Sequence, residues 1–164
     1  MGFPNRVNLN PPVGIEGGFA SASNTHNVLA GTAQIVADEA GVTIGRFAYA
    51  DLATGKASTA KKTGANVAVG FVGRGSNAGL VTAYLGTDSM AIQAGFGVTL
   101  FDRGDFWVKT TTAATVGQAV FADDTTGAIS TGEAGATVAG STEIPLFKVA
   151  SVGAANSLIK ISAF

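Results

Sequence analysis

The sequence contains no cysteine and only one histidine, His26, among its 164 residues. The absence of cysteine excludes disulfides, thiolate nucleophiles and cysteine-ligated zinc, so the fold depends on packing. A serine–histidine–aspartate triad or a histidine metal site would rest entirely on His26, and we expect this side chain to be an exposed polar group. We therefore predict no catalytic residue, no metal site and no cofactor, and we do not expect an enzyme.

Charge is also scarce, since charged residues make up 13% of the chain and the net charge is -1. This balance lacks the basic footprint of a protein that binds a phosphate backbone, so nucleic acid is not an expected partner. Few charges combined with 23 glycines are typical of a surface that another protein covers.

Long hydrophobic runs are missing, although 46% of the residues are hydrophobic. No stretch approaches the roughly 18 consecutive apolar residues of a membrane span, so no membrane partner is expected. Met1 leads directly into a glycine- and proline-containing segment without an apolar run. We expect no secretory signal, and synthesis in a cytoplasm.

The length favours a single domain, preceded by an extended N-terminal arm over residues 1–27. Pro4, Pro11 and Pro12 disfavour both helix and central strand there, because proline fixes φ and lacks an amide donor. Composition alone leaves a frayed terminus as the alternative. Several apolar residues in the segment favour an arm that lies along a neighbour's surface.

Residues 28–164 predict an all-β domain, a single compact β-sandwich or β-barrel. Short apolar runs alternate with Gly, Asn and Asp at intervals of roughly 8 to 12 residues. The strongest hairpin signal places residues 98–101 and 106–109 on either side of a turn at 102–105. A one-residue slip in the alternation predicts a bulge at Gly45 and Arg46. Further strands are expected near residues 67–71, 80–85, 118–122, 128–130, 146–149 and 158–161.

Two aspartate pairs, Asp102 with Asp105 and Asp123 with Asp124, lie beside glycines. We interpret both as turn residues whose side chains cap nearby amides, rather than as the opposed carboxylates of a glycosidase or as a calcium loop. The segment 73–78 matches a dinucleotide fingerprint, but the residues after it indicate a strand instead of a helix. A glycine turn explains it.

Arg103, Gly104 and Asp105 form a tripeptide that some adhesion receptors recognise, and Trp107 with Tyr84 could form a sugar-stacking platform. Arg103 to Asp105 is also a good turn sequence, and alternating aromatic residues in a β protein more often belong to the core.

Five segments, residues 1–8, 42–50, 68–72, 98–109 and 116–122, resemble the head cement, or decoration, proteins of tailed bacteriophages. The resemblance runs nearly end to end and involves no catalytic motif. It implies a virion structural protein, made in the host cytoplasm, that binds the outer surface of the capsid and cements major capsid subunits together as a dimer or trimer. The expected capsid contacts lie in the arm, at Phe3, Pro4, Arg6, Val7, Leu9, Pro11 and Pro12.

The sequence leaves other functions open. A carbohydrate-binding or adhesion module would use the aromatic or Arg103 to Asp105 residues, and a small hydrolase would use the aspartates and His26. A tail or head-fibre component is a further alternative, because fold does not determine function. The loop that contains Lys61 and Lys62 matches nothing in the resemblance, and its role is open.

Overall fold

The computed structural model describes residues 14–31, 34–75 and 90–163, and these contain strands and no helix. The strands are β1 (His26–Asn27), β2 (Val36–Ala37), β3 (Val42–Thr43), β4 (Phe47–Asp51), β5 (Lys56–Ser58), β6 (Val67–Val72), β7 (Ala91–Ile92), β8 (Leu100–Lys109), β9 (Ala119–Asp123), β10 (Ile129–Gly132), β11 (Ser141–Val149) and β12 (Leu158–Ala163). The all-β prediction is confirmed. The strand predicted at residues 80–85 lies outside the described residues.

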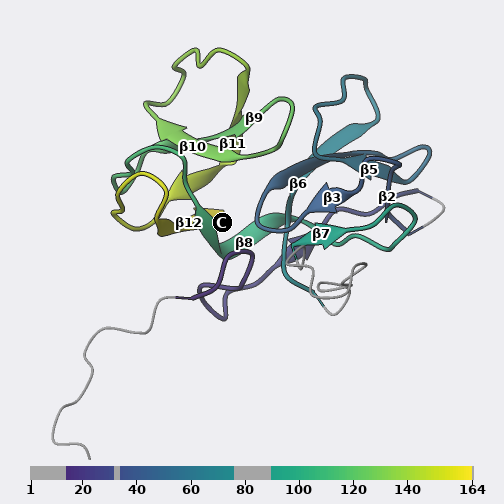
Figure 1. The fold of residues 1–164 in the computed structure, drawn as a ribbon, viewed down its shortest axis with the longest axis horizontal. Coiled ribbons are helices and arrows are strands. Elements are labelled where there is room, and N and C mark those ends of the chain that lie inside the picture. Colours follow the sequence, from purple (N-terminus) through teal and green to yellow (C-terminus); the bar gives the residue numbers. More distant parts are fainter. Residues whose placement is uncertain (1–13, 32–33, 76–89, 164) are drawn as a thin grey trace, which may run out of the picture.

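One sheet of 10 strands dominates the molecule, in the order β10-β9-β11-β12-β8-β6-β4-β5-β2, with β1 also paired to β8. β3 and β7 form a separate pair. Figure 1 shows two halves, β9 to β12 and β2 to β6, which meet at β8. The sheet does not close into a barrel, because β10 pairs only with β9 among the described strands. An isolated bridge from Thr110 to Ile129, and a hydrogen bond from the Thr131 amide to the Thr112 hydroxyl, connect β10 to the segment that follows β8.

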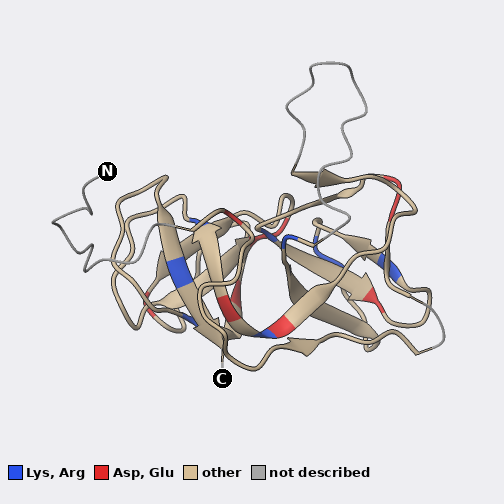
Figure 2. Cartoon of the chain, turned by 90° about the horizontal axis from the view of Figure 1, so that it is seen from below, with Lys and Arg blue, Asp and Glu red and all other residues tan. Residues whose placement is uncertain are grey.

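The central strand β4 and the last three residues of β6, 70–72, are buried on both faces. Phe47 and Phe71 face one core, whereas their neighbours Ala48 and Val72 face another. The side-chain period of two places large residues on one face and mostly small ones on the other. Two-sided burial also explains why β6 has no charged residue and β4 has only Asp51, at its end. Figure 2 shows where the Lys, Arg, Asp and Glu residues lie along the chain.

The larger core joins the two halves. Phe47 packs against Phe147 with ring centroids 5.2 Å apart, and Phe71 packs against Phe106 at 4.6 Å. Each fully buried phenylalanine contributes about 1.5–3 kcal/mol of transfer free energy. Because Phe47 and Phe71 come from one half and Phe147 from the other, neither half encloses this core alone.

The predicted hairpin at residues 102–105 is wrong. β8 runs without reversal from Leu100 to Lys109, and β12 pairs with it continuously from Gly104 to Lys109. Gly104 has a φ of 132°, so the strand bends there but does not turn back. Pairing with distant strands overrides the local turn preference.

The predicted bulge at Gly45 and Arg46 is also replaced by a different feature. Gly45, with a φ of 80°, lies in a turn that separates β3 from β4. β3 pairs with β7, and β4 pairs with β5 and β6. The slip in the alternation therefore marks the point where the chain passes from one sheet to the other.

Candidate capsid-contact surface

Residues 14–28, which we call the clasp, are hydrogen-bonded to β8 of the same chain. The Gly17 amide donates to the Trp107 carbonyl, and the Trp107 amide donates to the Gly18 carbonyl, each over 2.8 Å. The Ala20 amide donates to the Asp105 carbonyl over 2.8 Å. Three backbone bonds to one strand hold this part of the chain firmly, so it is not a free arm.

The clasp then crosses from one edge of β8 to the other. β12 occupies one edge of β8 over Gly104–Lys109, so residues 17–20 lie on the opposite edge. β6 pairs with Leu100 and Phe101 on the same edge of β8 as residues 17–20. The Val28 amide instead donates to the Leu100 carbonyl from the edge that β12 occupies. The crossing lies between residues 20 and 26, and Figure 1 shows this purple segment looping beside β8.

Polar side chains secure the crossing. The Asp105 carboxylate accepts hydrogen bonds from the hydroxyls of Ser21 and Ser162. Burial raises the pKa of Asp105, but hydrogen bonds from Ser162, Ser21 and Ser23 outweigh it, so the pKa lies below its usual value. The negative charge of Asp105 is therefore stabilised by the clasp and by β12.

Two further contacts complete the clasp. His26 Nδ1 lies 2.6 Å from Asp102 Oδ1, and the His26 side chain is 64% exposed, which confirms the expected exposed polar role. Phe19 packs on Phe101 and Phe106 with ring centroids 5.5 Å and 5.4 Å apart. Asp102 and Asp105 thus bind distant residues, which corrects the interpretation of this pair as local turn caps.

The predicted contact residues Phe3, Pro4, Arg6, Val7, Leu9, Pro11 and Pro12 all lie outside the described residues. The described chain begins at Gly14, directly against the Trp107 indole. A Cβ atom at Gly14 would lie 2.2 Å from the indole Nε1, so the contact requires glycine. The segment that carries the predicted contacts therefore joins the folded domain at Trp107.

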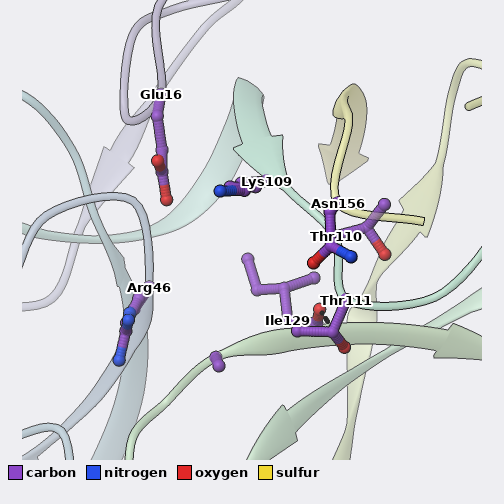
Figure 3. Close-up of a pocket in the computed structure, with 8 residues that line it drawn as sticks. Glu16, Arg46, Lys109, Thr110, Thr111, Ile129 and Asn156 are labelled. Carbon is purple, nitrogen blue, oxygen red and sulfur yellow. Dashed lines mark hydrogen bonds between the residues drawn. The ribbon is translucent and has the colours of Figure 1, made fainter. Parts of the chain in front are cut away.

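A polar hollow of about 190 Å³ lies beside the clasp, between Glu16, Arg46 and Lys109 (Figure 3). Thr110, Thr111, Ala128, Ile129 and Asn156 complete its lining. The Arg46 guanidinium donates to the Thr126 carbonyl over 3.2 Å. Two cationic groups and one carboxylate make this a place for a polar or charged partner group, and no nucleophile paired with a base lines it.

The sugar-platform and adhesion alternatives receive no support from the structure. Lys160 Nζ lies 5.0 Å from the Trp107 ring centroid, so lysine and Gly14 already contact the indole. Arg103 and Asp105 lie within β8 rather than at a hairpin tip, and the clasp engages the carboxylate of Asp105. Tyr84 lies outside the described residues.

The predicted capping role is confirmed for Asp123 but is wrong for Asp124, whose carboxylate accepts a hydrogen bond from the distant Thr142 hydroxyl and lies near Lys61. Asp123 Oδ1 accepts hydrogen bonds from the amides of Thr125 and Thr126, over 3.1 Å and 2.7 Å. Within the described residues, no group of three or more His, Asp or Glu side chains could hold a metal ion. Nor does any described segment form a helix long and apolar enough to span a membrane.

The loop with Lys61 and Lys62 connects separate parts of the sheet. Lys61 Nζ donates to Thr142 Oγ1 over 2.6 Å and lies 3.6 Å from Asp124 Oδ2, so it reaches the C-terminal half. Lys62 Nζ lies 3.4 Å from Asp38 Oδ2 in the N-terminal half. The two lysines have a structural role that could not be inferred from the sequence.

The model of the XM1 gp53 minor capsid protein family matches residues 3–163. The chain belongs to this family. The similarity to phage capsid-associated proteins that the sequence suggested is thereby confirmed, and this minor capsid protein is a structural component of the virion.

Among solved structures, a similar chain comes from the capsid of Myoviridae phage XM1. The two chains are 19% identical with a TM-score of 0.60, and the match covers 99% of this chain and 97% of that chain. At this identity the comparison supports the fold of the minor capsid protein. No curated protein matches the chain.

Proposed function

We propose that this minor capsid protein binds the outer surface of the phage head and cements major capsid subunits together, as a dimer or trimer and without enzymatic activity. The observation that carries the proposal is the clasp. It fixes the base of residues 1–13 on the folded domain, so a contact made by that segment is transmitted to the whole β domain.

The composition of residues 1–13 suits such a contact. The segment contains Phe3, Val7 and Leu9 together with three prolines, and Arg6 is its only charged side chain. Prolines reduce the conformational freedom that binding must remove, and apolar side chains provide area to bury against a partner. Fully extended, these residues reach at most about 45 Å from Gly14, enough to span part of a neighbouring subunit.

Cementing needs only modest affinity at each site. A protein that binds the assembled shell and not the separated subunits shifts the equilibrium towards the shell by mass action. If the protein is a dimer or trimer, contacts made by linked copies add through effective concentration. Weak contacts repeated over the head are therefore sufficient.

The first test is removal of residues 2–13 while the clasp is retained. We expect the truncated protein to keep the unfolding midpoint of the full chain, because no described strand is lost, and to occupy purified heads at least tenfold more weakly. Occupancy is measured by co-sedimentation with heads that lack the protein. Ala154→Ser, in an exposed loop of the C-terminal half, is the matched control and should bind as wild type.

The cementing step has its own measurement. Heads filled with the protein should release DNA at a higher temperature than heads without it, and the truncated protein should restore less of that difference. Equal release temperatures with full occupancy would show that the protein decorates the head without cementing it. Undiminished occupancy by the truncated protein would refute the role of residues 1–13.

A further inference from the structure

The outward face of the sheet formed by β8, β12 and β11 carries most of its charge as Lys and Arg. Along β8, Phe106 and Val108 are buried in the core, so the alternating residues Arg103, Trp107 and Lys109 point outward. The same alternation in β12 buries Ile159 and Ile161 and turns Lys160 outward.

The strand register places these outward residues on one surface. Lys160 lies opposite Trp107, Leu158 opposite Lys109, and Ser162 opposite Asp105. Lys148 of β11 lies opposite Ser162 on the next strand. Directly opposed side chains are about 5 Å apart at Cβ. We call the set Arg103, Lys109, Lys148 and Lys160 the basic face.

The basic face is not neutralised by the described part of this chain. None of its four cationic groups forms an ion pair with a described carboxylate, whereas Lys61 and Lys62 both do. Two carboxylates lie on the outward side of these strands. Asp105 accepts hydrogen bonds from two serine hydroxyls, and Glu143 of β11, next to the buried Ile144, accepts one from the Gly135 amide. Four of the 10 Lys and Arg residues thus gather on one face of a chain whose net charge is -1.

The hollow in Figure 3 forms one border of this face. It adds the Arg46 guanidinium and the Glu16 carboxylate next to Lys109. The Glu16 side chain packs against the backbone of Gly45, where a Cβ atom would lie 2.5 Å from Glu16 Cγ. Cationic groups therefore outnumber carboxylates across the face and its border together.

The N-terminal segment joins the domain on the same surface. Gly14, the first described residue, contacts the Trp107 indole, so the described part of the chain begins beside the basic face. A partner bound by residues 1–13 is thus brought towards Lys109 and Lys160.

We infer that the basic face binds an acidic surface of a neighbouring protein in the capsid, and this inference rests on the proposed function. Across a protein interface a positive patch faces a negative one, which speeds association and orients the complex. Nucleic acid is the weaker partner, because the chain as a whole is negative and Asp105 and Glu16 would face the phosphates.

The test compares Lys109→Gln/Lys148→Gln/Lys160→Gln with Lys56→Gln. Lys56 is an exposed lysine of β5, in the other half of the molecule, and is the matched control for loss of a surface charge. Binding to purified heads that lack the protein is measured at several salt concentrations. Circular dichroism melts check that both variants fold, and a mobility-shift titration with duplex DNA tests the alternative partner.

We expect wild type and Lys56→Gln to bind heads equally and to lose affinity as salt rises. The triple variant should bind about tenfold more weakly at low salt and show a smaller salt dependence. Equal binding and equal salt dependence of the triple variant would overturn the inference, as would loss of DNA binding with unchanged head binding. If wild type itself does not bind heads, the proposed function fails instead.

Discussion

Asp123 shows how a single side chain organises a turn in this protein. Its Oδ1 atom accepts hydrogen bonds from the Thr126 hydroxyl and amide, each over 2.7 Å, and from the Thr125 amide. The Thr126 hydroxyl and amide are the main reasons why the pKa of Asp123 lies below its usual value. This role was predictable, because aspartate side chains in turns commonly accept hydrogen bonds from amides about two residues further along the chain.

The lowered pKa of Asp123 predicts a dependence of stability on acid. Because the folded pKa lies below the unfolded one, the unfolded chain binds more protons in acid, and stability falls as the pH drops below about 4. Urea unfolding between pH 6 and 2 should show this loss. Asp123→Asn should be less stable than wild type at pH 7 and should flatten the acid dependence. If the stability of Asp123→Asn fell with decreasing pH as steeply as that of wild type, the stabilising role of the Asp123 carboxylate would be contradicted.

At the scale of elements, the turn between β9 and β10 depends on its contact with β4. Gly127 has a φ of 65°, and a Cβ atom there would lie 2.1 Å from the Phe47 carbonyl oxygen. The Phe47 amide also donates to the Gly127 carbonyl over 3.1 Å. The turn thus packs against the first residue of a strand that is 80 residues away in the sequence, and no local pattern indicates this.

We expect Gly127→Ala to lower the free energy of unfolding by about 2–4 kcal/mol, because strain in φ adds to a clash with backbone. Gly135→Ala is the matched control, since Gly135 has a φ of 76° but no atom within 4 Å of an added Cβ. Gly135→Ala should lower the free energy of unfolding by only about 1 kcal/mol. Urea denaturation of both variants measures the difference, and equal losses would show that the contact with Phe47 is unimportant.

The clasp and β8 are the elements where the sequence-based prediction failed. Residues 102–105 have ideal turn composition, yet they continue a strand because β12 and the clasp pair with it on both edges. The basic face was missed for a similar reason. Lysines alternate with apolar residues near Lys109 and Lys160, but only the register shows that these strands are adjacent.

At the scale of the whole molecule, the shared core makes both halves one cooperative unit. Phe147 comes from β11, yet it packs against Phe47 of β4 and Phe106 of β8. We expect Phe147→Ala to lower the free energy of unfolding by about 3–5 kcal/mol, because apolar burial is lost and a cavity is left behind. Val152→Ala, at a side chain that is 74% exposed, should change stability by less than about 0.5 kcal/mol.

Calorimetry distinguishes one cooperative unit from two. Phe147→Ala should lower the midpoint of a single transition, with the calorimetric enthalpy equal to the van't Hoff enthalpy. Two transitions, of which only the one for β9 to β12 moves, would show that the halves unfold independently.

The sequence by itself determined the all-β class, because the alternation of apolar residues and the spacing of turn residues are local properties of the chain. The absence of cysteine and the single histidine likewise limited the available chemistry. Only the tertiary structure decided that the clasp binds β8, that β8 continues through residues 102–105, and that lysines of three strands share one face. The physical reason is that alternation tells which face of a strand a residue occupies, whereas the partner across the sheet depends on packing between distant segments.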